Sequence, residues 1–407
     1  MMVCGVSGQN SLRQKVPDEH ESYGMAVDLL RKCSRKDGFI AAKERTTNGN
    51  YHRVWARDSM ICGIAAIMSG EPELLKTMKD SLKTLMRFQH EQSEIPSNVN
   101  PETKGTSYGG TAGRVDAQLW FLIGFSQYVK KTKDMAFLRR YFNNFEKNIK
   151  LIRVYEFNHK NLIYVPKSGD WADEYVQEGY VLYDQILYHQ AFKEYAYLLR
   201  KLGRSPKKAY EKAGIIKDTL QKNYWFKTSN VKHSYHRQLY ERALADAKPF
   251  FMPFFNAAEY GKYFDLLANS LTILCGIATP TQARKIQDYV SAHHSLPPSF
   301  FPVITKKDRL WKELENNYRN HFRNKPHEYH NGGIWPMTLG FYAASKKKKG
   351  RMIYAGIQDL NRKNNWEFNE VYHGKTKRPH GTKFQAWSAA GAVIAYQASF
   401  NDMEVFL

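Results

Sequence analysis

The chain has 407 residues, of which 43% are hydrophobic and 14% aromatic, so it contains enough apolar material for a large core. No stretch reaches the roughly 18 consecutive apolar residues of a membrane span, and residues 1–21 lack the apolar segment of a secretory signal. A net charge of +22 would suit an anionic partner, but no nucleic-acid-binding motif accompanies the lysine clusters, so we expect a solvated basic surface and neither a nucleic-acid nor a membrane partner.

The four cysteines, Cys4, Cys33, Cys62 and Cys275, show no CxxC spacing. They are typical of scattered reduced thiols, which favours a cytoplasmic location and disfavours a zinc site. The histidines show no HExxH spacing either. We therefore expect no metal and no other cofactor.

Apolar residues recur at helical spacing along most of the chain. The pattern predicts twelve helices, in chain order at residues 21–34, 57–69, 71–91, 114–130, 133–153, 180–202, 205–224, 261–277, 280–294, 332–346, 350–363 and 383–399. No low-complexity linker interrupts this series, so we expect one domain over residues 1–407.

Two kinds of helix alternate along the chain. Segment 133–153 carries apolar residues at three- and four-residue spacing, which is typical of a helix that is half exposed. The stretches at 60–68 and 119–125 are apolar on nearly all sides, so those helices should be enclosed. The alternation predicts an all-α fold of six helical hairpins in two concentric layers, an (α/α)6 toroid, although an open helical solenoid would give a similar pattern.

The connections that precede the predicted inner helices are rich in aromatic, acidic and amide side chains. Five of them read "NYHRVWARDS", "SYGGTAGRVD", "SGDWADEYVQEGYVLYDQ", "HEYHNGGIWP" and "EFNEVYHGKTKRPHGTKFQAW". Loops at the same relative place in successive hairpins should converge on one end of a toroid, where a rigid scaffold can position functional groups. We therefore expect Arg57 and Asp58 to face a central pocket.

This composition suits a neutral sugar, because aromatic rings can cover its C–H faces while carboxylates and amides bond its hydroxyls. Hydrolysis of a glycosidic bond needs two carboxyl groups, one acid and one base or nucleophile. The acidic candidates are Asp170, Asp173 and Glu174 in one connection, and Glu367 and Glu370 in another. The residue pattern alone does not choose among them.

The motifs "VWARDSM", "GRVDAQLWFLIGF", "GDWADE", "YHNGGIWP" and "FNEVYHG…HGTKFQAWSAAG" together resemble glycoside hydrolases of the six-hairpin toroid type. The pattern is similar to the glucosidase domain of glycogen-debranching enzymes (amylo-α-1,6-glucosidases) and to the neutral/alkaline invertases. The motifs occur in register from about residue 50 to residue 400. The resemblance implies a glycosidase that acts on an oligosaccharide or disaccharide without a cofactor.

Matched residue by residue, the resemblance implies that Asp173 is the general acid and Glu370 the general base of an inverting mechanism. Its two carboxyl groups should then lie about 6.5–9.5 Å apart. Burial near Trp171 should raise the pKa of the acid while the base stays ionised. The resemblance places sugar contacts at Arg57, Asp58, Asp116, Gln185, His330, Asn331 and Gln385, more weakly at Asn269, and stacking platforms at Trp55, Trp171 and Trp335.

Structural roles remain as alternatives for several of these residues. Asp58 and Asp116 equally suit helix caps. His330 and Asn331 also suit a turn before Pro336, and Trp387, like Trp120, is more typical of a helical core position.

Two departures from the plant-type invertases bear on the substrate. Their "DRRM" reads "DEYV" at residues 173–176, and the arginine expected near the end of the last substrate loop is replaced around Thr382–Lys383. Both disfavour sucrose. The sequence therefore predicts an inverting, exo-acting hydrolase of an α-glucoside, of the debranching type. A neutral/alkaline invertase, a phosphorylase on the same scaffold and a non-catalytic carbohydrate-binding protein are the alternatives.

Overall fold

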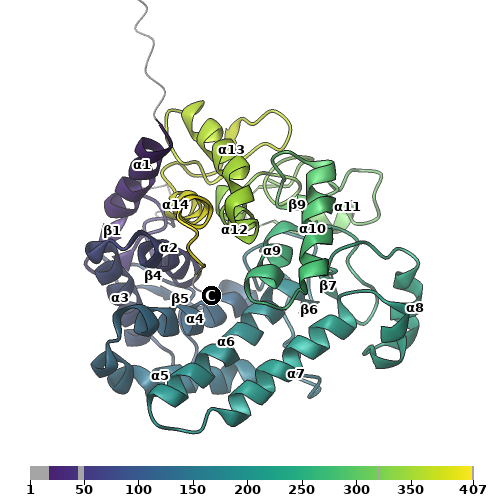
Figure 1. Ribbon diagram of the computed structural model, residues 1–407, viewed down its shortest axis with the longest axis horizontal. Helices are drawn as coiled ribbons and strands as arrows, with labels where there is room; N and C mark the ends of the chain where they lie inside the picture. The colour runs from purple at the N-terminus through teal and green to yellow at the C-terminus, as the bar shows by residue number, and fades with distance from the viewer. Residues whose placement is uncertain (1–17, 45–49, 319–320, 406–407) are drawn as a thin grey trace, which may run out of the picture.

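The computed structural model describes residues 18–44, 50–318 and 321–405 (Figure 1). Cys4 and most of the N-terminal segment considered for a signal lie outside this range. All twelve predicted helices are present, with ends displaced by a few residues. The inner helices are α2 (Ala56–Ser69), α4 (Val115–Thr132), α6 (Leu182–Lys201), α9 (Leu266–Leu274), α12 (Pro336–Ser345) and α14 (Ala386–Phe400). The outer helices are α1 (Glu19–Lys32), α3 (Pro72–Arg87), α5 (Met135–Val154), α7 (Lys207–Asn223), α10 (Pro280–His293) and α13 (Arg351–Arg362).

Two short helices were not predicted, α8 (Arg237–Leu244) and α11 (Trp311–Asn316). With eight and six residues, they are too short for periodicity to reveal them. Helix α9 is shorter than predicted because the chain before it is extended and Asp265 caps it, its side chain accepting a hydrogen bond from the Ala268 amide at 2.9 Å. Local capping chemistry, which the periodic pattern does not capture, therefore fixed this boundary.

The six inner helices form a closed ring. Each packs against the next in chain order, and α14 packs against α2 as well as α12, as Figure 1 shows. Gly340 in α12 and Gly391 in α14 allow two helix backbones to meet, since a Cβ on Gly340 would lie 2.4 Å from the Gly391 carbonyl oxygen. Closure confirms the toroid and excludes the open solenoid.

Burial follows the predicted division into layers. Twelve of the fourteen residues of α2 are buried, whereas α5 buries seven of its twenty, on one face. The inner helices therefore exchange apolar contacts with both neighbours and with the outer layer, and the outer helices keep one face in solvent.

The connections that enter the inner helices contain very short strands. They are β1 (Ser34–Arg35), β2 (Gly38–Phe39), β3 (Val54–Trp55), β4 (Asn98–Val99), β5 (Thr106–Ser107), β6 (Tyr180–Val181), β7 (Phe254–Phe255), β8 (Phe264–Asp265), β9 (Phe300–Phe301), β10 (Val371–Tyr372) and β11 (Pro379–His380). All strand pairs among them are antiparallel.

Backbone pairing joins each of the six connections to the next, and the last to the first. In ring order the pairs are β3 with β4, the Val115 amide with the Gly169 carbonyl, β6 with β7, β8 with β9, Ile334 with Tyr372, and Gln385 with Ala42. The connections therefore form a hydrogen-bonded circle at the end of the toroid where the inner helices begin.

Buried amide side chains strengthen three of these connections. Gln118, Gln185 and Asn269 each occupy the fourth position of an inner helix, and each bonds both the amide and the carbonyl of one residue in the preceding connection, Ile95, Ile163 and Phe251 respectively. The sequence resemblance placed sugar contacts at Gln185 and Asn269. In the structure, the amides of both bind backbone.

No helix in the described residues is long and apolar enough to cross a membrane. Within the same residues, no three His, Cys, Asp or Glu side chains are arranged to hold a metal ion.

We expect Gln185→Ala to destabilise the protein. The substitution leaves the buried amide and carbonyl of Ile163 without partners. Each such group costs roughly 1–3 kcal/mol, so the free energy of unfolding should fall by about 2–6 kcal/mol in urea titration. Gln238→Ala, on the exposed face of α8, is the matched control and should change it little. Unchanged stability with a raised KM would instead favour sugar contact by Gln185.

Candidate active site

A cavity of about 420 Å³ opens at the end of the ring where the connections meet. Eight of the predicted site residues line it: Trp55, Arg57, Asp58, Trp171, Asp173, Trp335, Glu370 and Gln385. Its other lining residues are Ala41, Asn50, Tyr51, Glu174, His321, Arg323, Tyr329 and Trp387. Gln185, Asp116, His330 and Asn331 do not line it.

The two candidate catalytic carboxyls come from opposite parts of the ring. Asp173 lies in the third connection, before α6, and Glu370 in the sixth, before α14. Both line the same cavity although they are nearly two hundred residues apart in sequence. Ring closure alone brings them together.

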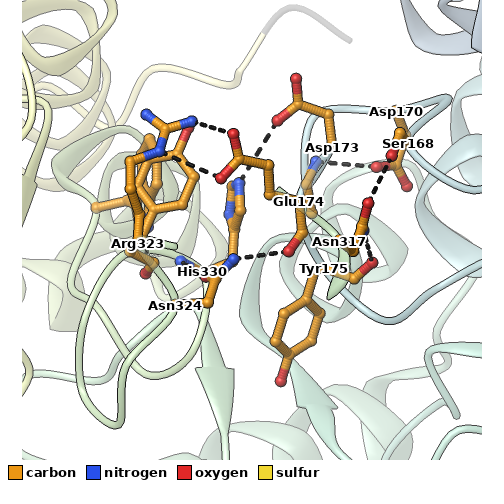
Figure 2. A network of polar contacts seen from close by, with 12 residues as sticks. Ser168, Asp170, Asp173, Glu174, Tyr175, Asn317, Arg323, Asn324 and His330 are labelled. Carbon is orange, nitrogen blue, oxygen red and sulfur yellow. Dashed lines mark hydrogen bonds and ion pairs between the residues drawn. The ribbon is translucent and has the colours of Figure 1, made fainter. Parts of the chain in front are cut away.

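Asp173 is held in place by a buried arginine. Its Oδ2 lies 2.7 Å from Nη2 of Arg114, whose side chain is 2% exposed, and Arg114 also donates to the Gly113 and Ser168 carbonyls. Nε2 of His330 lies 3.9 Å from Oδ1 of Asp173, as Figure 2 shows. The carboxyl therefore has a fixed position at the cavity wall.

The two other acidic candidates in this connection, Asp170 and Glu174, have different surroundings. Asp170 accepts hydrogen bonds from the Ala172 amide at 2.9 Å and from Gln177 at 2.6 Å, so it braces the loop that carries Asp173. Burial raises the pKa of Asp170 to about 8. Glu174 lines the cavity but forms an ion pair with Arg323.

Glu370 accepts two hydrogen bonds. The Tyr51 hydroxyl donates to Oε1 at 2.7 Å, and the Thr382 amide donates to Oε2 at 3.0 Å. Gly381 makes this approach possible, because its φ is +74° and a Cβ would lie 2.4 Å from Oε2. The alternative base, Glu367, pairs with Lys383 at 2.8 Å and does not line the cavity.

Burial raises the pKa of Glu370, and the Tyr51 hydrogen bond opposes this rise. The sequence predicts a raised pKa for the acid and a base that stays ionised. Glu370 is 3% exposed, so desolvation acts on the proposed base as well, and the base stays ionised only above its raised pKa.

Arg57 lies between two carboxylates. Its Nη1 is 2.8 Å from Asp116 Oδ2, its Nε is 3.7 Å from Asp58 Oδ2, and its guanidinium lies 5.5 Å from the Trp387 ring centre. Burial raises the pKa of Asp58 to about 6, although Arg57 opposes this rise. Asp116 thus stands behind Arg57 and orients it, whereas Arg57 and Asp58 reach the cavity.

The capping alternative for these two aspartates is wrong. The N-cap residues of α2 and α4 are Trp55 and Arg114, and neither helix has a side-chain cap hydrogen bond. Asp58 and Asp116 lie inside the first turn, where a negative charge is still favourable.

His330 and Asn331 support the cavity from behind. Asn331 bonds the backbone of Ile304 in both directions, at 2.7 and 2.8 Å. The His330 ring stacks on Trp335 with 5.0 Å between centroids and meets Trp171 edge-on at 5.2 Å. Burial lowers the pKa of His330, although the neighbouring Asp173 opposes this change.

Several polar atoms at the cavity are buried and make no hydrogen bond within the described part of the chain. They include both amide atoms of Gln385 and the indole nitrogens of Trp171 and Trp387. Buried polar groups are nearly always paired in folded proteins, so unpaired donors and acceptors at a cavity suit a ligand with hydroxyl groups. Trp387, interpreted from sequence as a core residue, therefore belongs to the cavity wall.

Sequence reasoning missed Tyr51, Arg114, Arg323 and Tyr329 as parts of the site. Tyr51, Arg114 and Tyr329 lie in the quoted motifs, and the signal available for them was that they stand near Arg57, Asp116 and His330 in sequence. Arg323 lies outside every motif, and its partner Glu174 is 149 residues away in sequence. No local pattern could have indicated that contact.

A family model described as amylo-alpha-1,6-glucosidase matches residues 46–394 of the chain. Probable alkaline/neutral invertase D of Arabidopsis thaliana is 23% identical, over 93% of this chain and 82% of the relative. Cytosolic invertase 1 of Oryza sativa subsp. japonica is 26% identical, over 97% of this chain and 80% of the relative.

Solved structures share the fold. The GH63 mannosylglycerate hydrolase from Thermus thermophilus, in complex with Tris and D-glycerate, superposes with a TM-score of 0.66 at 12% identity, over 92% of this chain and 99% of that one. A bacterial glucoamylase complexed with acarbose gives 0.68 at 13% identity, over 95% and 56% of the two chains. With a family model that matches most of its length and a closed ring of six hairpins, the chain belongs to the amylo-alpha-1,6-glucosidase family and is a six-hairpin glycoside hydrolase.

Proposed function

We propose that the protein is an inverting, exo-acting glycosidase that removes a terminal α-linked glucosyl residue. The observation that carries this proposal is the meeting of Asp173 and Glu370 in one cavity, where polar atoms of Gln385, Trp171 and Trp387 are buried and make no hydrogen bond within the described residues. The polar atoms can form hydrogen bonds with a sugar that binds between the two carboxyl groups.

In this mechanism Asp173 carries a proton to the glycosidic oxygen, and that oxygen leaves with the remainder of the substrate. Glu370 accepts a proton from a water molecule, whose oxygen attacks the anomeric carbon from the opposite face. Inversion needs space for that water, so the two carboxyls should be about 6.5–9.5 Å apart. Arg114 and Tyr51 hold the two groups in place, through Oδ2 of Asp173 and Oε1 of Glu370.

For the substrate we propose an α-1,6-linked glucoside. The family description supports this choice, as do the two departures from the invertases at residues 173–176 and 382–383. Sucrose is the second candidate, because several similar curated proteins are named invertases. A panel of isomaltose, a branched glucan and sucrose, with and without phosphate, tests this choice by the release of glucose and glucose-1-phosphate. Release of glucose-1-phosphate only with phosphate would identify a phosphorylase.

We also propose a cytoplasmic location. Three free, buried cysteines among the described residues and the name of the rice relative, a cytosolic invertase, support it. Other relatives are named chloroplastic or mitochondrial.

We expect inversion at the anomeric carbon. Proton NMR during the first minutes of hydrolysis of an α-glucoside should show β-glucose before mutarotation equilibrates the anomers, because water attacks opposite the leaving group. First appearance of α-glucose would indicate a retaining mechanism and would contradict the assigned roles.

Variants of the two carboxyls should lose activity in distinguishable ways. Asp173→Asn and Glu370→Ala should each slow hydrolysis of a disaccharide by about 10²–10⁴-fold. Asp173→Asn should retain much of its activity on α-glucosyl fluoride, whose leaving group needs no proton. Azide should restore turnover in Glu370→Ala and yield β-glucosyl azide.

Asp359→Asn, on the exposed face of α13, is the control and should behave like the wild type. Wild-type turnover in Asp173→Asn would move the acid role to Glu174, and wild-type turnover in Glu370→Ala would move the base role to Glu367.

The acidic limb of the pH profile should report Glu370. The base must be ionised, and burial raises its pKa above the ordinary value of 4.5, so kcat/KM should fall as the pH decreases through that raised value. Tyr51→Phe removes a hydrogen bond that favours the charged carboxylate and should shift the limb to higher pH. Burial also raises the pKa of Asp58, to about 6, so the variant Asp58→Asn separates the contribution of Asp58 to this limb from that of Glu370. A limb that Tyr51→Phe leaves unmoved would contradict the assignment.

A further inference from the structure

Arg323 is held rigidly at the more open side of the cavity. Its Nε and Nη2 lie 3.2 and 2.5 Å from the two carboxylate oxygens of Glu174, and its guanidinium lies 3.9 Å from the centre of the Tyr329 ring. Figure 2 shows this side-on pair next to Asp173. The two-point contact with Glu174 and the contact with the ring together fix the plane of the guanidinium.

The backbone beside Arg323 is also anchored. Asn324 donates to the Glu174 carbonyl at 2.6 Å and accepts from the amides of His330 and Asn331 at 2.9 and 3.2 Å. Tyr329 has a φ of +45°, a conformation that bulky residues rarely adopt outside constrained sites. Arg323 is therefore pre-organised, and a ligand would not have to order it.

Part of the guanidinium remains available. A guanidinium has five N–H donors, and the pair with Glu174 uses one on Nε and one on Nη2. No described residue accepts a hydrogen bond from Nη1 of Arg323. Because 31% of this side chain is exposed and it lines the cavity, the remaining donors can reach a bound molecule.

The place of Arg323 identifies the part of the substrate it would meet. The side chains of Arg57 and Asp58 are 11% and 8% exposed, and Trp335 is nearly fully buried, so this enclosed side suits the terminal sugar. Arg323 is more exposed and is bound to Glu174, the neighbour of the proposed acid Asp173. The leaving group departs on the side of the acid.

The local charges select against an anionic leaving group. Four carboxyl groups, those of Asp58, Asp173, Glu174 and Glu370, share the cavity with two guanidinium groups. Glu174 already compensates the charge of Arg323. The free N–H groups therefore suit neutral hydroxyl oxygens better than a carboxylate or phosphate.

We propose that Arg323 binds the hydroxyl groups of a neutral leaving-group sugar and so determines specificity for that part of the substrate, with Glu174 and Tyr329 as positioning residues. This inference rests on the proposed glycosidase function. It gives Arg323 a role outside the general acid and base chemistry.

The test compares two substrates that share a glucosyl group. α-Glucosyl fluoride has no sugar leaving group, whereas isomaltose and sucrose do. For Arg323→Gln we expect kcat/KM to fall by about 10- to 100-fold on the disaccharide that the wild type hydrolyses, because a hydrogen bond from a charged donor is lost. The value of kcat/KM on α-glucosyl fluoride should change little. Inhibition by the released leaving-group sugar should weaken in parallel. Glu174→Gln should produce the same selective loss in milder form.

Arg309→Gln, which alters an exposed arginine paired with Glu259, is the matched control and should leave both activities unchanged. Equal losses on fluoride and disaccharide, or no loss on either, would overturn the role of Arg323 while leaving the glycosidase proposal intact. A wild-type protein that releases glucose from neither class of substrate would overturn both proposals.

Discussion

Pairing between the six connections is the constraint on which the site depends. Each connection bonds to the next along the ring, and Gln385 pairs with Ala42 to join the last to the first. A segment in such a circle cannot move without breaking pairs on both sides. A backbone held by such hydrogen bonds presents its side chains in a fixed geometry. A site built from separate loops needs that rigidity.

Three arginines at the site each contact one carboxyl group. Arg57 pairs with Asp116, Arg114 with Asp173, and Arg323 with Glu174. Each arginine lies in a different connection or first turn from its carboxylate, so every pair joins two segments of the ring. Removing one partner of such a pair would leave the other charge uncompensated, so these pairs link segments of the ring and orient the cavity wall.

The residues that line the cavity explain why it suits a neutral sugar. Indole rings from Trp55, Trp171, Trp335 and Trp387 supply apolar surface, and the amide of Gln385 supplies polar atoms that make no hydrogen bond within the described residues. Desolvation raises the pKa of the carboxyl groups of Asp58 and Glu370 in the same cavity. The proposed sugar binding and proton transfer would therefore depend on one feature, a partly enclosed cavity lined by fixed polar groups.

The sequence by itself determined the helices, their alternation and the order of the motifs, because the spacing of apolar residues and the local composition depend only on residues close together in the chain. It also indicated Asp173 and Glu370 through the resemblance of their motifs. Only the tertiary structure decided that Gln185 and Asn331 bond backbone, that Trp387 faces the cavity and that Arg323 meets Glu174. The physical reason is that these contacts depend on how the chain folds back on itself, over 22 and 27 residues for the two amides and 149 residues for the ion pair, and no local pattern records such partners.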